Sequence, residues 1–324
     1  MSTKTINGFF CGGAGINVGK SFVNKPTLEG LASIEPIFCD TSESNIRGLN
    51  TRANKINFEL VPDTDGSGGI RGENNVAIAD IVNAILNKYD TTRLNIVCFS
   101  ASGGSGSVFG PLIASELLKR EAPIILMVIG SEESKLRIIN TIKTLKSLDN
   151  IATNIIKKPI VMYYAHNLPG AKFSVTDNQI IGAITSISVL ASGLNEGLDS
   201  KDLYNFLMWT VISSAKPQLS LLEIISTVDA ETLKKIPVSL ASLYRNEDTP
   251  RVTLISDYDC YGYVSDPDLI KEDLHFVITN DNVVSIAQSV NERVNDIESK
   301  ANARSNQTSI TDKNDVAQDN GLIL

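Results

Sequence analysis

The stretch FFCGGAGINVGKSF, residues 9–22, decides which nucleotide-binding fold the chain can adopt. From Ala14 it reads A-x-x-x-x-G-K-S, one glycine short of the phosphate-binding P-loop, in which the lysine contacts phosphate. From Gly12 it reads GGAGIN, a diglycine turn between a strand and a helix. The first interpretation gives Lys20 a phosphate to bind, and the second leaves Lys20 pointing to solvent from the first helix.

Composition narrows the class of protein. The chain has 324 residues, of which 42% are hydrophobic, enough for a large core and, we expect, two domains. The net charge of −8, the lack of a Lys/Arg cluster and the 6% aromatic content argue against direct nucleic-acid binding. No apolar run approaches the roughly 20 residues that cross a bilayer, and MSTKTINGFF lacks signal-peptide features. We therefore expect no membrane partner.

The cysteines and histidines are scattered along the chain. Thiols this far apart, most of them at the ends of apolar runs, predict buried, unpaired cysteines in a reducing compartment. Because no Cys or His residues cluster, we expect no protein metal site, and neither histidine is given a catalytic role. The residues concerned are Cys11, Cys39, Cys98, Cys260, His166 and His275.

Short apolar runs alternate with amphipathic segments in the first half of the chain. The runs are rich in Val, Ile and Phe and bracket helical patterns at 75–89 and 110–121. This alternation predicts a parallel sheet covered on both faces, a doubly wound α/β domain over residues 1–172. The predicted strands are 6–12, 33–40, 56–61, 94–100, 123–130 and 159–166.

The pattern changes after residue 172. Residues 173–192 predict one long central helix, assigned to 173–193, that is apolar on more than one side and hence buried between layers. A charged turn and a further helical region follow. Then TPRVTLISDYDC (249–260) and LHFVITN (274–280) predict strands of a smaller α/β domain, 194–304, with a final helix at 282–304. Residues 305–324 predict a mobile tail.

Three glycine-rich loops follow predicted strands. Glycine lets backbone N–H groups approach an anion, and a helix amino terminus adds a favourable dipole. Any single loop equally fits a tight strand-to-helix turn, but three at one sheet edge predict a polyphosphate held from several sides. The loops contain Gly12, Gly13 and Gly15; Gly66, Gly68 and Gly69; and Gly103, Gly104 and Gly106, with Ser105 and Ser107 as possible hydroxyl donors.

These loops disfavour the P-loop. Ala14 replaces its first glycine, and the strongest anion loop, SGGSGS, has no following lysine. A partition-type P-loop ATPase that uses Lys20 remains the alternative. A dinucleotide-dependent oxidoreductase is less favoured still, since GGAGIN lacks the full G-x-G-x-x-G.

GGAGIN and SGGSGS resemble the first nucleotide loop and the G-G-G-[ST]-G-[ST]-G signature of the tubulin/FtsZ family of GTPases. Ser102 and Val108 stand where that signature usually has glycine. The resemblance is closest to phage-encoded tubulins and covers essentially the whole chain, including GPLIASEL, VIGSEES and LHFVITNDNVV. It implies a nucleotide-binding domain, a long central helix, a smaller carboxyl-terminal domain, and GTP or GDP as ligand with Mg²⁺ carried by the nucleotide.

The resemblance also implies roles for single residues. Cys11 would lie beneath the base, Asp40 and Thr41 near the phosphates or Mg²⁺, and Glu133 at the ribose. Gly68, Gly69 and Arg71 would sense the terminal phosphate, and residues 102–107 would grip the α- and β-phosphates. The full implied set is Cys11, Gly12, Gly13, Gly15, Asn17, Asp40, Thr41, Gly68, Gly69, Arg71, Ser102, Gly103, Gly104, Ser105, Gly106, Ser107, Glu133, Asn140, Asn167, Phe173 and Asp177.

The base-binding pair has a physical rationale. Phe173 and Asp177 are four residues apart and share one helix face. An aromatic ring stacks on a purine, while a carboxylate accepts the paired N–H donors that guanine has and adenine lacks, which favours GTP. In the alternative interpretation, Phe173 is a core residue and Asp177 is solvated.

Hydrolysis is assigned to Asp199 and Asp202 in GLDSKD, which falls where the family keeps its catalytic carboxylates. Their spacing puts both on one side of a helical first turn, and the alternative is that they only cap that helix. The resemblance implies that they lie opposite the subunit's own nucleotide and enter the pocket of the next subunit in a head-to-tail filament. Gly197 stands where the family usually has asparagine.

The implied function is a GTP-hydrolysing cytoskeletal polymer, activated by polymerisation, in the cytoplasm of a phage-infected bacterium. Its partners would be other copies of itself, helped by the tail with Asp312, Asp315 and Asp319, and viral cargo. A filament protein that does not hydrolyse its nucleotide, and a tail without a role, remain alternatives.

Overall fold

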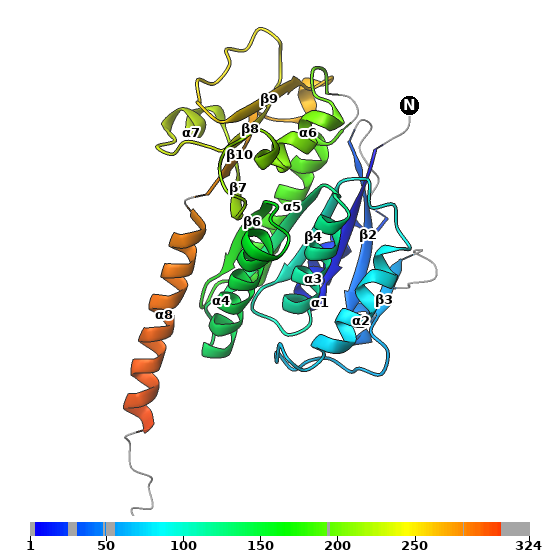
Figure 1. Ribbon diagram of the computed structural model, residues 1–324, viewed down its shortest axis with the longest axis vertical. Helices are drawn as coiled ribbons and strands as arrows, with labels where there is room; N and C mark the ends of the chain where they lie inside the picture. Colours follow the sequence, from blue (N-terminus) through cyan, green and yellow to red (C-terminus); the bar gives the residue numbers. More distant parts are fainter. Residues whose placement is uncertain are drawn as a thin grey trace, which may run out of the picture.

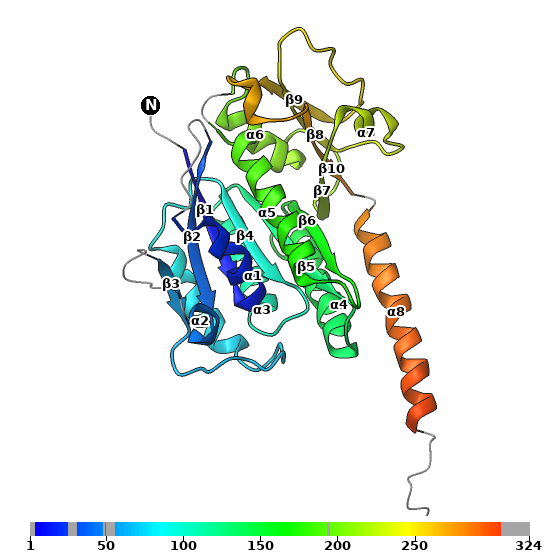
Figure 2. The ribbon, with the colours of Figure 1, turned by 180° about the vertical axis from the view of Figure 1, so that it is seen from behind.

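The computed structural model describes residues 4–24, 31–47, 49, 56–192, 195–280 and 282–305. Within these residues, ten strands form one sheet in the order β3-β2-β1-β4-β5-β6-β7-β10-β8-β9, with helices on both faces (Figures 1 and 2). The strands are β1 (Thr5–Cys11), β2 (Ser33–Asp40), β3 (Asn57–Leu60), β4 (Asn95–Ser100), β5 (Ile124–Ser131), β6 (Ile160–Asn167), β7 (Leu219–Ile225), β8 (Ser239–Tyr244), β9 (Tyr258–Tyr263) and β10 (Leu274–Thr279).

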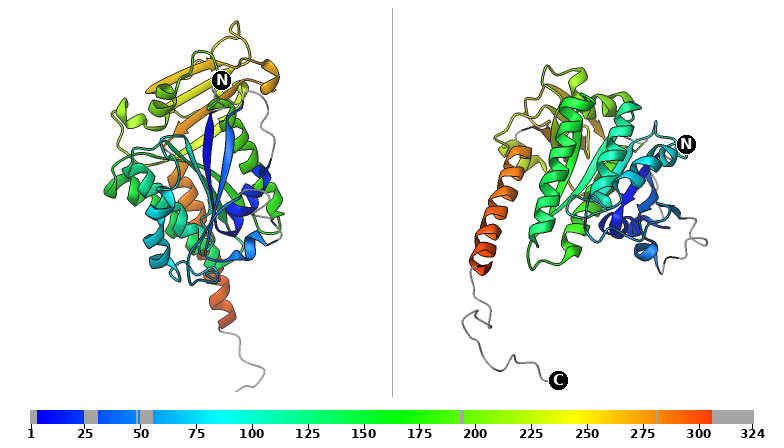
Figure 3. Two further views of the ribbon diagram at one scale, coloured as in Figure 1. Left: turned by 90° about the vertical axis from the view of Figure 1, so that its right-hand side faces the viewer. Right: turned by 60° about the horizontal axis from the view of Figure 1, so that its bottom comes forward.

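Helices cover the sheet unevenly. One face carries α1 and α5, and the other carries α2, α3 and α4, as the edge-on view in Figure 3 shows. No helix of the described residues is long and apolar enough to cross a membrane. The helices are α1 (Gly12–Gly19), α2 (Asn75–Leu86), α3 (Gly106–Lys119), α4 (Lys135–Asn150), α5 (Phe173–Leu190), α6 (Ser200–Leu207), α7 (Thr227–Thr232) and α8 (Asn282–Ser305).

The first six strands confirm the predicted doubly wound domain. They are parallel, and β1 pairs with both β2 and β4, so the strand order reverses beside β1. Cys11 at the end of β1 is in register with Cys39 of β2 and Phe99 of β4. The loops that follow β1 and β4 therefore emerge side by side at the point where such folds bind ligands.

The continuous apolar strands reflect a sheet that is buried on both faces. Phe9 and Phe10 are neighbours on β1, so their side chains point to opposite faces, and both are fully buried. Phe9 packs with α2 and α3, and Phe10 with α1 and α5. Burying one such ring contributes about 1.5–3 kcal/mol, which explains why apolar residues occupy successive positions.

The four cysteines are buried and free, as predicted. The central helix is predicted correctly in extent but only partly in burial. Ile184 and Ile187 are buried, and so are all side chains from 187 to 192, whereas Phe173 and Val175 at the start of α5 are half-exposed. Only the last turn of α5 is thus buried all round.

The carboxyl-terminal half corrects two predictions. Residues 251–256 form no strand, and β9 begins only at Tyr258, because the partner strand β8 is in register with residues 258–263. Strands β7 and β8 occupy a region that was expected to be helical. Their short apolar runs, LSLLEII and SLASLY, lack the length and alternation that separate a strand from a buried helix segment.

The two halves of the chain share the sheet. β7 pairs with β6 in parallel, β10 is antiparallel to β7 and β8, and β9 pairs in parallel with β8. Helix α8 confirms the predicted final helix and lies along α4 (Figure 1). The domain boundaries at 172, 193 and 304 stay predictions, and residues 306–324 of the predicted tail lie outside the described residues.

Candidate functional site: a nucleotide cavity

A cavity of about 840 Å³ opens at the carboxyl ends of β1 and β4. All three glycine loops line it, together with the first residues of α4 and α5. The structure therefore brings together fifteen of the predicted nucleotide-binding residues: Cys11, Gly12, Gly13, Asn17, Asp40, Gly68, Gly69, Ser102, Gly103, Gly104, Ser105, Gly106, Asn167, Phe173 and Asp177.

The first and third loops touch through their backbones. Gly12 has a φ of +68°, and a Cβ at this position would lie 2.8 Å from the backbone nitrogen of Gly106. A Cβ on Gly106 would lie 2.7 Å from the carbonyl oxygen of Cys11. Only glycine permits this approach, which brings the amino termini of α1 and α3 to one cavity and favours a bound anion.

The second loop covers the third. A Cβ on Gly104 would lie 1.9 Å from Oγ of Ser67, and the backbone N–H of Ser105 donates to the same Oγ at 3.1 Å. Asn140 fixes both loops from below, because its Nδ2 donates to the carbonyl of Gly69 at 2.9 Å and to that of Ser102 at 3.1 Å. Asn140 thus positions the loops and does not line the cavity.

Three further predicted residues also act from behind the cavity wall. The Thr41 hydroxyl lies 2.5 Å from Oγ of Ser105. The Ser107 hydroxyl donates to the carbonyls of Gly103 at 2.7 Å and Gly104 at 2.8 Å. Gly15 lets α1 approach β4, since a Cβ there would lie 2.4 Å from the Cys98 carbonyl oxygen.

Arg71 and Glu133 do not line the cavity. Nε of Arg71 donates to the Ser107 carbonyl at 3.3 Å, and a terminal nitrogen donates to Oγ of Ser147 on α4 at 3.0 Å. Glu133 is exposed and pairs with Arg137, which itself lines the cavity. The roles of Arg71 at the terminal phosphate and of Glu133 at the ribose stay predictions.

The end of the cavity formed by β6 and α5 suits a planar base. Oδ1 of Asn167 is buried and has no hydrogen-bond partner among the described residues, as expected for an acceptor that awaits a ligand. The ring of Phe173 is 50% exposed, although phenylalanine is usually buried. Burial raises the pKa of the Asp177 carboxyl above its ordinary value. An orphaned acceptor, an open ring face and a desolvated carboxyl together fit a purine with adjacent N–H donors.

Asp40 lies at the other end, beside the first loop. It is only 3% exposed, accepts from the Thr41 N–H at 2.7 Å, and accepts from Nδ2 of Asn45 at 2.6 Å. Burial raises the pKa of the Asp40 carboxyl, and these hydrogen bonds oppose the rise. Among the described residues, no group of three or more His, Cys, Asp or Glu is placed to hold a metal ion.

Several residues that line the cavity were missed from the sequence. Ser67 lies inside the second glycine loop and had a recognisable signal. Asn45 and Arg47 lie in and just after a short helical turn, and Arg137 lies in the first turn of α4; none of them matches a motif, so only the folded chain reveals them. Lys20 does not line the cavity, and its Nζ donates to Oδ1 of Asn17 at 3.3 Å on the surface, in line with the solvent-facing prediction.

The predicted catalytic acids lie at the start of α6, at the top of Figure 1. This is the edge of the sheet formed by the amino ends of the parallel strands, opposite the cavity. They form a capping box: Oδ1 of Asp199 accepts from the backbone N–H of Lys201 at 2.7 Å and of Asp202 at 2.9 Å. Oδ2 of Asp202 accepts from the Asp199 N–H at 3.1 Å, and its Oδ1 from the Tyr258 hydroxyl at 3.2 Å. The predicted cap is therefore present, and both the catalytic role and the alternative that the acids only cap α6 stay predictions. The backbone hydrogen bonds hold the pKa of the exposed Asp199 below its ordinary value.

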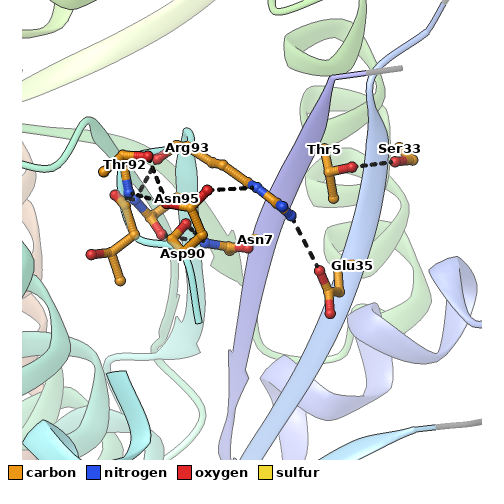
Figure 4. Close-up of polar contacts among 9 residues, drawn as sticks. Thr5, Asn7, Ser33, Glu35, Asp90, Thr92, Arg93 and Asn95 are labelled. Atoms are coloured by element: carbon orange, nitrogen blue, oxygen red, sulfur yellow. Dashed lines mark hydrogen bonds and ion pairs between the residues drawn. The ribbon is translucent and has the colours of Figure 1, made fainter. Parts of the chain in front are cut away.

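A polar cluster stabilises the same edge beside α6 (Figure 4). The buried Asn7 donates to Oδ1 of Asn95 and to the Asp90 carbonyl, both at 2.9 Å. Arg93 pairs with Asp90 at 3.2 Å and with Glu35 at 3.6 Å. These contacts fix the loop before β4, which lines a second cavity of about 570 Å³ together with residues of α6.

Comparison with known proteins identifies the class. Residues 5–158 match the GTPase domain of the Tubulin/FtsZ family. The chain belongs to this family, and the fold and the three-loop cavity agree with it. Residues 198–286 match the carboxyl-terminal domain of phage tubulin-like proteins, which narrows the class to the phage branch.

Individual relatives agree over the whole chain. A phage tubulin-like protein of Pseudomonas phage PhiPA3 is 29% identical, with 100% of both chains covered. The structure of the GDP complex of the phage tubulin PhuZ is 27% identical, with a TM-score of 0.85 over 98% of this chain and 99% of that one. The PhuZ201 filament is 28% identical, with a TM-score of 0.83 and the same coverage.

Proposed function

We propose that the chain binds GTP in the cavity and hydrolyses it when a second copy stacks head-to-tail against it. One observation carries the proposal: Asp199 and Asp202 lie at the amino edge of the sheet, whereas the cavity lies at the carboxyl edge. A subunit's own acids therefore cannot serve its own cavity. A head-to-tail contact brings one edge to the other, and a contact of this kind that does not close into a ring generates a filament.

Nucleotide binding rests on the composition of the cavity. The converging amino termini of α1 and α3 favour the phosphates, and Asn167, Phe173 and Asp177 favour guanine. The GDP complex of the related PhuZ supports the same ligand class. Mg²⁺ would arrive on the phosphates and neutralise part of their charge, with Asp40 and Asp65 as the carboxylates that line the phosphate end.

The acids would act on water. The capping box holds Asp199 and Asp202 in fixed positions at the start of α6. The cap uses Oδ1 of Asp199, which leaves Oδ2 to accept a proton from a water held against the γ-phosphate of the neighbour. Loss of the γ-phosphate would then weaken the contact and make the filament dynamic.

The test is GTP turnover measured against protein concentration. We expect phosphate release per subunit to rise steeply as the protein begins to sediment as polymer, while GTP binding is already present at lower concentration. A specific activity that stays flat across the assembly transition would exclude the shared site. Binding and assembly without phosphate release would instead identify a structural filament protein.

The cellular setting is part of the same proposal. The relatives come from bacteriophages, which supports action in the cytoplasm of an infected bacterium, with viral cargo as a possible load. We also propose that residues 306–324 assist assembly. Deleting residues 310–324 should raise the critical concentration without changing GTP affinity, and an unchanged critical concentration would exclude that role.

A further inference from the structure

The segment that joins β5 to α4, residues 131–137, has two differently used sides. Ser134, Leu136 and Arg137 line the nucleotide cavity. Glu132 and Lys135 face away from it and pair with α8. The same seven residues thus connect the cavity to the final helix of the chain.

Two ion pairs make this connection. Nζ of Lys135 lies 2.9 Å from Oε1 of Glu298, and Nε of Arg293 lies 3.9 Å from Oε2 of Glu132. Helix α8 is otherwise held by an apolar stripe that begins at Val283 and includes Val290, which is only 2% exposed. The apolar stripe fixes where α8 lies, and the ion pairs tie it to the wall of the cavity.

Glu132 also reaches the base-binding end. Its backbone N–H donates to the carbonyl of Asn167 at 3.2 Å, and its Oε1 lies 3.2 Å from Nε2 of His166. Nδ1 of His166 lies 2.7 Å from the Tyr164 hydroxyl. Glu132 is therefore the point where α8, the end of β6 and the start of α4 meet.

An open groove separates part of α8 from the sheet at this point. A cavity of about 430 Å³ lies between α8 and β6, lined by Glu132, His166 and Tyr164 on one side and by Ile286, Ser289 and Val290 on the other. Close packing resists displacement, whereas side chains along an open groove have no close packing on that side. Glu132 lines this groove and pairs with Arg293, so this ion pair would respond to a displacement of α8.

We propose that α8 sets the affinity of the nucleotide cavity by holding residues 131–137 from behind, with Glu132 and Lys135 as positioning residues. This inference rests on the proposed GTP binding. A ligand that contacts one side of the segment is linked to a helix that contacts the other, so bound nucleotide must in turn stabilise the docked position of α8. The residues that precede the tail thereby report the nucleotide state.

Charge exchange across the Lys135–Glu298 pair tests the proposal, because both side chains are 47% exposed and tolerate substitution. We expect Lys135→Glu and Glu298→Lys each to weaken binding of fluorescently labelled GTP about threefold, the scale of one exposed ion pair. The double exchange should restore wild-type affinity. Binding is measured below the concentration of assembly. Lys300→Gln, which removes an ion pair internal to α8, is the matched control and should leave affinity unchanged.

A second measurement uses the reciprocal effect. GTP should slow amide hydrogen exchange in α8 of the full chain, and Arg293→Gln should reduce that protection. Single variants that bind like wild type, or a double exchange that restores nothing, would overturn the role of α8. Wild-type protein that binds no GTP would overturn the proposed function instead, so the two failures are distinguishable.

Discussion

The two edges of the parallel sheet use their polar side chains in opposite ways. At the carboxyl edge, glycine loops leave an open cavity, and Oδ1 of Asn167 has no partner among the described residues. At the amino edge, Asn7 and Asn95 bond to each other, and Asp199 and Asp202 complete a capping box. One edge is built to receive a ligand, and the other holds rigid groups that have no ligand of their own. The contrast supports the proposal that a single copy binds nucleotide but needs a neighbour for hydrolysis.

The largest effect should come from Asp202→Ala. We expect phosphate release to fall by a factor of about 100 or more, the usual contribution of a positioned acid or base, while GTP affinity stays unchanged. Filaments should persist instead of disassembling. Phosphate release, labelled-GTP binding and filament lifetime are the measurements.

Because Asp202→Ala also removes half of a helix cap, a matched control is needed. Asp229→Ala removes the corresponding first-turn carboxylate of α7, which bonds to Ser226. Its turnover should equal that of wild type. Equal losses in the two variants would mean that helix capping, and not chemistry, is the role of Asp202.

Asp177→Asn tests the cavity edge. The substitution removes the charged carboxylate that would accept the two N–H donors of guanine, so GTP binding should weaken by about 10- to 100-fold. The amide that replaces it should favour XTP, whose base has a carbonyl in place of the amino group. Equilibrium binding of labelled GTP and XTP measures both changes. Unaltered GTP affinity would remove Asp177 from base recognition.

Mixing Asp177→Asn with Asp202→Ala tests whether the acids of one subunit act on the nucleotide of another. The first variant holds XTP and has intact acids, and the second holds GTP and lacks one acid. With XTP present and GTP kept below the weakened affinity of Asp177→Asn, neither variant alone should hydrolyse GTP, but mixed filaments should, because intact acids then meet GTP across the contact. Co-sedimenting mixed filaments that release no phosphate from GTP would contradict the shared site.

Acidification gives a smaller effect with a defined sign. Burial raises the pKa of Asp177, so its carboxylate takes up a proton at a higher pH than an ordinary aspartate and then no longer accepts both N–H donors of guanine. GTP affinity should be constant above this raised pKa and fall by up to about tenfold per pH unit below it. Binding titrations across acidic pH measure the fall, which should be absent in Asp177→Asn.

The smallest expected change is at Lys20. Since Lys20 bonds to Asn17 at the surface and does not line the cavity, Lys20→Ala should leave turnover within about twofold of wild type. Phosphate release at saturating GTP or ATP is the measurement. Loss of turnover would revive the P-loop ATPase interpretation.

The sequence predicted the cavity edge better than the rest, and the reasons are physical. Close backbone approach demands glycine at Gly12 and Gly106, so the demand is visible in the sequence. Two-sided burial likewise makes strands such as β1 continuous apolar runs. No such demand marks the direction of a long side chain, and Arg71 and Glu133 accordingly lie outside the cavity they were expected to line.

Other features depend on neighbours that the sequence does not name. The runs LSLLEII and SLASLY became strands because β6 and β10 provide pairing partners. Arg137 reaches the cavity because α4 begins beside it. The 3.6-residue pattern of α8 predicted a helix but not the element it packs against.

The junction between β6 and β7 has a mechanical consequence. Strand β6 pairs with β7, with Ile160, Val161 and Met162 in register with Leu219, Ser220 and Leu221. Backbone hydrogen bonds therefore join the two halves of the subunit into one continuous sheet. A push delivered at α6 would travel along the strands to the glycine loops without bending a flexible linker. In the proposed filament, stiffness of this kind would let a stack of subunits bear compressive load, and it would originate in a few amide groups in the middle of each subunit.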